Sequence, residues 1–89
     1  MLPIQCPSCH NALLVTQLSC TNCTTSVSGN YVLPVFLQIS KEEQNFILQF
    51  LLTSGSLKEM AAQMGNSYPT VRNKLDDIIQ KITILQSKL

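Results

Sequence analysis

The chain has 89 residues, of which 45% are hydrophobic and only 12% are charged, and its formal net charge is +1. A chain this short buries a modest core, so a bound metal or an oligomeric interface is expected to support it. No apolar run is long enough for a membrane span and no signal peptide precedes Cys6, which predicts a cytoplasmic protein without a membrane partner. The low charge favours a homodimer as the simplest partner for an apolar surface.

Two C-x-x-C motifs stand ten residues apart in a stretch of forty residues with no charged side chain. In a reducing compartment, paired motifs of this kind favour metal binding over disulfides. If each motif forms a tight turn on adjacent hairpins, four sulfurs can surround one ion at about 2.3 Å in a closed, structural site. We therefore predict one structural zinc ion per chain, although iron can use the same ligands. The predicted metal ligands are Cys6, Cys9, Cys20 and Cys23.

Two other interpretations of the cysteines are less favoured. The run from Cys6 to His10 also matches the C-x-x-C-H pattern of haem attachment, but this leaves the second cysteine pair unexplained. His10 is expected at the surface or beside the ligands. Oxidation of the thiolates could release the metal and act as a redox switch. Metal-bound structural thiolates are usually inert, so the closed zinc site is preferred.

The residues around the second motif are compatible with β-strands. Residues 13–18 form one candidate strand, and Gly29-Asn30 predicts a two-residue turn between strands at 25–27 and 31–33. Residues 1–38 are thus predicted to be a small β zinc ribbon. Because this unit has no Lys or Arg, it offers nothing to a phosphate backbone, and we assign it to packing and protein contact.

Residues 39–89 are predicted to form three helices. Ser40 and Glu43 form a capping box at the start of the first helix, and Gly55 is expected at its end. The run from Phe46 to Leu52 is apolar except at one position. A helix that is apolar nearly all round is expected to be buried on several sides.

The second and third helices match the helix-turn-helix pattern. Ser56 caps the second helix, Ala61 is small enough to let the two helices approach, and Gly65 makes the turn. Ser67 caps the third helix, on which Val71 faces inward. A plain three-helix packing unit is the alternative.

If the third helix enters a major groove, its first turns carry the DNA contacts. Arg can pair with guanine and Asn with adenine, and hydroxyls with free amides at a helix start can hold a phosphate. The predicted DNA-binding residues are Ser67, Tyr68, Thr70, Arg72, Asn73 and Lys74. The alternative for Arg72 and Lys74 is a solvated face on which Asp76 and Asp77 are their ion-pair partners.

The third helix is predicted to extend to the C-terminal end of the sequence. Its apolar residues alternate three and four apart, as in a short coiled-coil seam. We expect this seam to form a dimer contact rather than to pack on the chain's own ribbon. The predicted dimerisation residues are Leu75, Ile78, Ile82, Leu85 and Leu89.

The run from Ser67 to Asp76, the segment from Gly55 to Ala61 and the two cysteine pairs resemble a small bacterial family. That family joins a zinc ribbon to a helix-turn-helix and is catalogued as domain-of-unknown-function family 2089. The resemblance covers Cys6 to about Ile79. It implies an α+β architecture, a zinc ribbon followed by a helix-turn-helix, and suggests transcriptional regulation by analogy without supplying a proven activity.

The leading hypothesis is a dimeric, DNA-binding transcriptional regulator with a structural zinc site. The alternative is an adaptor that docks a partner protein, as an antitoxin does, without specific DNA binding. The uncharged ribbon supports the alternative, as does a net charge of about −1 once four thiolates hold one Zn²⁺. We expect no enzyme and no small-molecule substrate, because His10 is the sole histidine and no nucleophile has an evident base.

Overall fold

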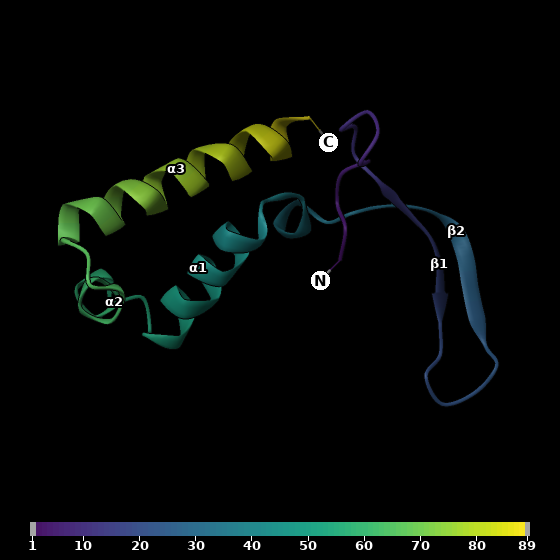
Figure 1. The fold of residues 1–89 in the computed structure, drawn as a ribbon, viewed down its shortest axis with the longest axis horizontal. Helices are drawn as coiled ribbons and strands as arrows, with labels where there is room; N and C mark the ends of the chain where they lie inside the picture. Colours follow the sequence, from purple (N-terminus) through teal and green to yellow (C-terminus); the bar gives the residue numbers. More distant parts are fainter. Residues whose placement is uncertain (1, 89) are drawn as a thin grey trace. The chain divides into compact units, whose positions relative to one another are not determined.

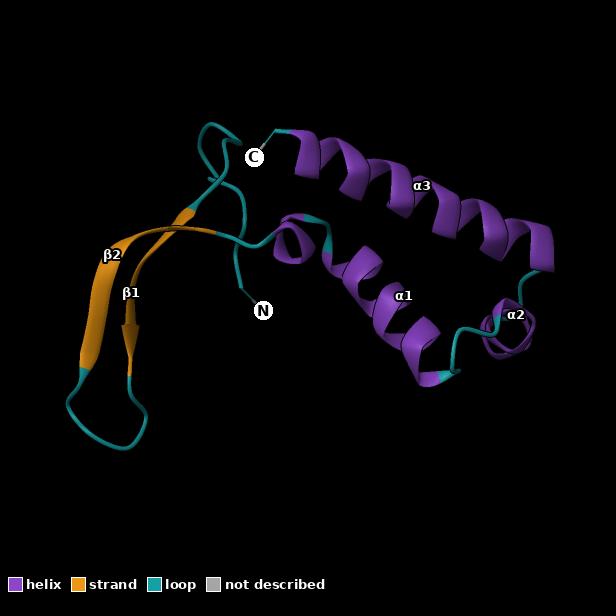
Figure 2. Ribbon diagram, turned by 180° about the vertical axis from the view of Figure 1, so that it is seen from behind, coloured by secondary structure: helices purple, strands orange, loops and turns teal. Residues whose placement is uncertain are grey.

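The structure is a computed structural model that describes residues 2–88. A β hairpin is followed by a short 3-10 helix and three α-helices (Figures 1 and 2). The chain divides between Gln38 and Ile39 into two compact units, a ribbon unit and a helical unit. This confirms the predicted α+β fold class. No helix within residues 2–88 is both long and apolar enough to cross a membrane.

The ribbon unit is built on two antiparallel strands, β1 (Leu14–Ser19) and β2 (Ser26–Val32). An isolated bridge between Gln5 and Ala12 precedes the hairpin, and the 3-10 helix η1 (Val35–Gln38) follows it. Within residues 2–38 only Leu33 is buried. The unit therefore has almost no hydrophobic core of its own.

The predicted turn at Gly29-Asn30 is wrong, because β2 runs through these residues without reversing. The pairing register shifts opposite Val15 to Gln17, and Gly29 lies in the irregular part of β2. A Cβ atom at Gly29 would lie 2.8 Å from the Tyr31 ring, so glycine here makes room for an aromatic ring. The hairpin reverses at residues 20–25 instead, where the second cysteine motif lies.

Helix α1 (Lys41–Leu52) begins as predicted. The Ser40 hydroxyl oxygen accepts the Glu43 N–H at 3.2 Å, and the Glu43 carboxylate accepts the Ser40 N–H at 2.9 Å. This reciprocal pair confirms the capping box. The helix ends at Leu52, where the chain turns through Thr53, whose hydroxyl donates to the Phe50 carbonyl at 2.7 Å.

Within the helical unit α1 is buried on one face only, and its burial on further sides stays a prediction. Phe46 is its one buried side chain, whereas Leu48, Leu51 and Leu52 are 55%, 66% and 76% exposed. The helix packs along one face only, since the two other helices of the unit cover one side of it. Three leucines are left on the opposite side.

Helices α2 (Leu57–Met64) and α3 (Tyr68–Ser87) form the predicted helix-turn-helix. The Ser56 and Ser67 hydroxyls cap them, and Gly65 adopts the left-handed conformation at φ 69° that ends α2. Ala61 is buried where the helices meet. The buried core of the helical unit consists of Ile39, Phe46, Leu57, Met60, Ala61, Val71 and Ile78.

The apolar seam of α3 packs within its own chain. Ile78 belongs to the core, and Leu75, Ile82 and Leu85 are partly buried against it. Leu89 lies outside the described residues. The apolar stripe of α3 that was predicted to form a dimer contact thus packs on the core that contains Phe46 and Met60. A long amphipathic helix buries its apolar stripe on the nearest apolar surface. Dimerisation through the seam stays a prediction.

Candidate metal centre and nucleic-acid interface

The first cysteine motif forms a tight turn closed by backbone hydrogen bonds. The Cys6 N–H donates to the Asn11 carbonyl at 2.8 Å, and the His10 N–H donates to the Cys6 carbonyl at 2.9 Å. The Ser8 N–H lies 3.4 Å from the Cys6 sulfur. Hydrogen bonds from the backbone N–H groups of Cys9 and Ser8 lower the pKa of the Cys6 thiol. The turn therefore favours the thiolate that a metal needs.

The second motif repeats this arrangement at the tip of the hairpin. The Asn22 N–H lies 3.3 Å from the Cys20 sulfur, and the Cys20 N–H donates to the Thr25 carbonyl at 2.8 Å. The Cys23 sulfur is 3.1 Å from the Thr25 hydroxyl. When the thiol is ionised this hydroxyl is the donor, so Thr25 lowers the pKa of Cys23. Each pair thus has the donor set and the backbone cradle of half a zinc–thiolate centre.

The two pairs lie at opposite ends of β1. The first motif precedes the strand and the second follows it, as the purple and blue loops at the two ends of the hairpin show in Figure 1. Six extended residues span about 20 Å, whereas four sulfurs around one zinc each lie about 2.3 Å from it. Within residues 2–88 no three His, Cys, Asp or Glu side chains gather closely enough to hold a metal.

Residues 14–19 between the two motifs are extended because most of them pair with β2. A single metal site formed by all four cysteines stays a prediction. All four cysteines are free thiols; Cys6 is half-buried and the other three are exposed.

The start of α3 presents polar side chains on its open side. Every predicted DNA-binding residue from Ser67 to Lys74 is exposed, while Val71 is fully buried against the core. The Ser67 hydroxyl accepts the Thr70 N–H at 3.4 Å and lies 2.8 Å from the Thr70 hydroxyl. Asn73 is about 200° around the helix from Val71 and so points away from the core.

Comparison with protein families divides the chain at the same place as the structure does. The zinc ribbon of DUF2089, a domain of unknown function, matches residues 6–37, and its helix-turn-helix part matches residues 39–85. The chain belongs to the DUF2089 family. The ribbon match supports zinc binding by the two cysteine pairs, and the second match supports a possible role in nucleic-acid binding. No curated protein and no solved structure matches the chain.

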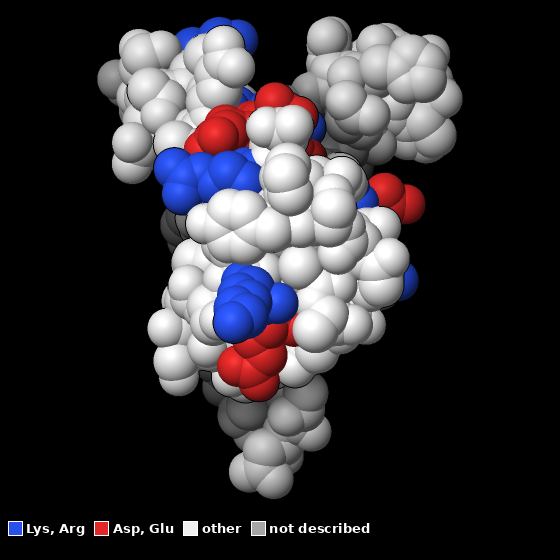
Figure 3. All heavy atoms as spheres, turned by 90° about the vertical axis from the view of Figure 1, so that its left-hand side faces the viewer, with Lys and Arg blue, Asp and Glu red and all other residues white. Residues whose placement is uncertain are grey.

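The basic side chains of this DUF2089 protein are interspersed with acidic ones. The Arg72 guanidinium lies 3.4 Å from the Asp76 carboxylate, and both side chains are more than half exposed. This is the ion pair that the alternative for Arg72 predicted, and an exposed pair of this kind contributes little energy. Figure 3, viewed from the side of Figure 1 on which α2 lies, shows blue and red side chains beside one another.

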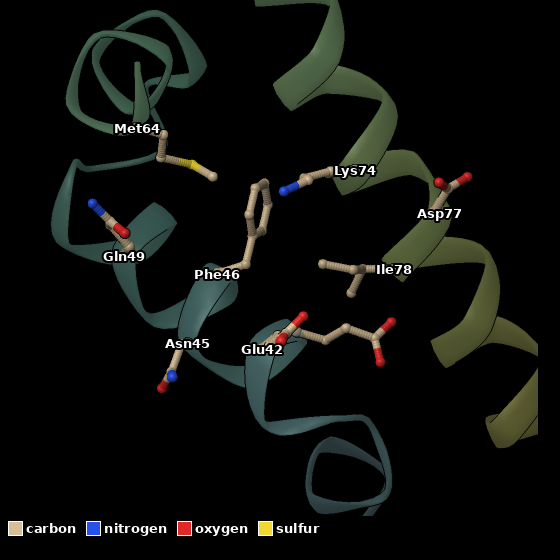
Figure 4. A pocket seen from close by; sticks show the side chains of 9 residues that line it. Glu42, Asn45, Phe46, Gln49, Met64, Lys74, Asp77 and Ile78 are labelled. Atoms are coloured by element: carbon tan, nitrogen blue, oxygen red, sulfur yellow. The ribbon is translucent and has the colours of Figure 1, made fainter. Parts of the chain in front are cut away.

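The Lys74 side chain lies in a different environment from those of Arg72 and Asn73 on α3. It lines an open hollow of about 490 Å³ whose other walls include Phe46 and Met64. Figure 4 shows its side chain extending over this hollow toward those two residues. Lys74 is therefore directed to one flank of the helix, whereas Arg72 and Asn73 lie farther round on the open side.

One ion pair near this hollow could not be predicted from the local sequence. The Lys81 ammonium on α3 donates to the Glu43 carboxylate at 2.7 Å. Burial alone would raise the pKa of Glu43, but hydrogen bonds from Lys81 and from the Ser40 N–H, with the Lys81 charge, lower it overall. The two residues are 38 positions apart, so only the packing of α3 beside α1 brings them together.

Proposed function

We propose that this protein is a transcriptional regulator that binds DNA through α2 and α3, acts in the cytoplasm and has no enzymatic activity of its own. The observation that supports it best is the open side of the first turns of α3. There Thr70, Arg72 and Asn73 are exposed on a helix whose other side is anchored by the buried Val71. Such a helix can lie in a major groove without disturbing its own core.

Each exposed residue has a chemical role in this proposal. Arg72 can pair with guanine and Asn73 with adenine, since both residue types make bidentate contacts with base edges. Ser67 and Thr70 already share a hydrogen bond at the helix start, where free N–H groups favour a phosphate oxygen. Tyr68, half exposed, is suited to contact the sugar-phosphate backbone.

The scarcity of positive charge limits how this protein can bind. The helical unit carries all six basic residues of the chain together with its five acidic ones. Non-specific affinity comes mainly from phosphate neutralisation, so it should be weak here. Base contacts and a second copy must then supply the affinity. We propose a dimer that reads two half-sites about 34 Å, one helical turn, apart.

The first test is selection of fragmented genomic DNA from the host by the zinc-loaded protein at low and at physiological salt. A sequence-specific regulator retains a few sites at physiological salt, and those sites share a motif. Uniform loss of all fragments as salt rises would contradict the proposal, because it leaves only phosphate contacts.

Substitutions on α3 then assign the base contacts. Arg72→Ala and Asn73→Ala should each weaken binding to the selected site by about 1–3 kcal/mol and relax the preference at one base pair. Gln80→Ala is the matched control, because it removes an exposed polar side chain from the same helix about 12 Å farther along. Equal losses for all three variants would count against readout by the helix start.

A protein-interaction adaptor is the second candidate. The exposed Leu48, Leu51 and Leu52 favour it, because a cluster of apolar side chains on one helix face is typical of a protein-binding surface. Under this alternative, a stable complex with a partner protein would form without DNA. Leu51→Ser would weaken that complex and leave any DNA binding unchanged.

A further inference from the structure

The hollow beside Lys74 is not explained by contacts of α3 with a DNA groove. All the residues that line it belong to the helical unit: α1 and α3 form its two walls, and Met64 is the last residue of α2. Its volume of about 490 Å³ lies within the range of about 300–1,000 Å³ that is typical of small-molecule sites. The hollow is therefore large enough to hold a ligand.

The floor of the hollow is apolar. Phe46 and Ile78 belong to the buried core, and Met64 is partly buried against the same core. Figure 4 shows the Phe46 ring in the middle, with the Met64 and Ile78 side chains directed toward it. Methionine is flexible and polarisable, so it adapts to the shape of an apolar group. Such a floor favours a ligand with apolar side chains.

The hollow carries opposite charges on the two sides of the Phe46 ring. Lys74 on α3 lies on one side of this ring and Glu42 on α1 lies on the other (Figure 4). Within residues 2–88 neither of them forms an ion pair, whereas Glu43, which also lines the hollow, is held by Lys81. A ligand can therefore offer an ammonium group to Glu42 and a carboxylate to Lys74.

The other polar groups distinguish between classes of ligand. Three carboxylates line the hollow, yet within the described residues 2–88 no three acidic, His or Cys side chains gather closely enough to hold a metal. The α1 wall also carries the side-chain amides of Asn45 and Gln49. Gln49 donates one N–H to Gln63 at 2.9 Å, which leaves its carbonyl oxygen as an acceptor. Amides that both donate and accept are suited to hydrogen-bond a peptide group.

We propose that this hollow binds a short peptide of apolar residues with free termini. Its N-terminal ammonium pairs with Glu42, its C-terminal carboxylate pairs with Lys74, and its side chains pack on Phe46. The α1 wall from Glu42 to Gln49 rises by about 10 Å, which is also about the length of an extended tripeptide. A single α-amino acid fits less well, because its two charges lie on neighbouring groups and not on either side of an aromatic ring.

This proposal goes beyond DNA binding, because the peptide needs no DNA in order to bind. Lys74 is also one of the predicted DNA-binding residues, so a bound peptide would neutralise one positive charge on α3. Weaker DNA binding in the presence of peptide is a consequence that rests on the proposed function. Binding of the peptide itself does not rest on it.

Titration of the zinc-loaded 89-residue chain with trileucine, followed through amide NMR shifts, provides the test. Trileucine should give saturable shifts in residues 42–49 and 74–78. Triglycine, N-acetyl-trileucine and trileucine amide each lack one recognised group and should bind about threefold or more weakly. Absence of saturable shifts in these residues, or equal affinity for trileucine and both blocked peptides, would overturn the proposal.

Substitutions then assign each terminus of the peptide. Lys74→Gln should weaken trileucine binding about threefold and leave binding of trileucine amide unchanged, and Glu42→Gln should act in the same way toward N-acetyl-trileucine. Lys58→Gln and Glu59→Gln on α2 are the matched controls, because they remove the same charges from exposed positions that do not line the hollow. Losses as large in the controls, or no loss in any variant, would overturn the proposal. No arm contains DNA, so failure here leaves the proposed function standing.

Discussion

The ribbon unit and the helical unit are stabilised in different ways. In the helical unit seven side chains from three helices and their flanks form one buried core, with Ile39, Met60 and Val71 fully enclosed. In the ribbon unit Leu33 is the one buried side chain within residues 2–38. The hydrophobic effect can therefore hold the helical unit together, whereas the ribbon unit needs other sources of stability.

The two units also contain different kinds of chemically active residues. Every cysteine lies in the unit without a core, and every Lys, Arg, Asp and Glu lies in the unit with one. A bound metal can stabilise a small fold that has no hydrophobic core. The apolar side chains of the ribbon unit can therefore remain exposed on its surface. The helical unit has a core and can place polar residues at the start of α3.

Removal of zinc is expected to give the largest difference between the units. A strong chelator should unfold the ribbon unit, since structural zinc in small domains supplies about 10 kcal/mol or more of folding free energy. Amide protection in residues 12–33 should be lost, while α1, α2 and α3 keep theirs. Hydrogen exchange with and without chelator measures this. Unchanged protection in the hairpin would show that the ribbon unit folds without metal.

Truncation of a core side chain in the helical unit should destabilise that unit and leave the ribbon unit unchanged. Met60→Ala removes a fully buried side chain and should cost about 2–5 kcal/mol of stability. Leu52→Ala, at a position 76% exposed on α1, is the matched control and should change stability by about 0.5 kcal/mol or less. Thermal unfolding followed by helical circular dichroism compares them. The absorption spectrum of Co²⁺ bound in place of zinc should be the same in both variants, because the predicted metal ligands lie in the other unit.

The Glu43–Lys81 contact should make the helical unit sensitive to acid. Because the pKa of Glu43 is lowered in the folded state, its contribution is fully present above the ordinary value of 4.5 and is lost as pH falls through the folded value. Glu43→Gln should cost about 1 kcal/mol or less at neutral pH through loss of the ion pair with Lys81, because glutamine can keep the capping box. The difference from wild type should shrink as the pH falls below 4.5. A difference that stays constant with pH would contradict a role for the Glu43 charge.

The smallest effect on stability is expected on the open side of α3. Asp76→Asn removes the partner of Arg72 and should change stability by about 0.5 kcal/mol or less, because both side chains are exposed. The same change frees the guanidinium and removes a negative charge, so affinity for the selected DNA site should rise. Thermal unfolding and a DNA titration on one sample measure both. Lower DNA affinity would indicate that Asp76 orients Arg72 for binding.

Local signals in the sequence predicted most elements of the helical unit. The capping residues Ser40, Ser56 and Ser67 each start a helix, and Gly65 ends one, because these interactions join residues at most four positions apart. The tight turns predicted at the two cysteine motifs are confirmed for the same reason, because the N–H···S contacts of each turn lie within one C-x-x-C. The predicted turn at Gly29 failed because β2 continues through this residue and pairs with β1 on both sides of it.

Sequence by itself thus determined the order of the units, the family and the starts of the helices, and it predicts the residues that can hold zinc. Tertiary structure alone decided which apolar faces are covered, and it assigned the seam of α3 to the chain's own core while leaving Leu52 of α1 exposed. It also decided that residues 14–19 between the two cysteine pairs are extended, because most of them pair with β2. These outcomes depend on pairing and packing between distant segments, which no pattern of neighbouring residues specifies.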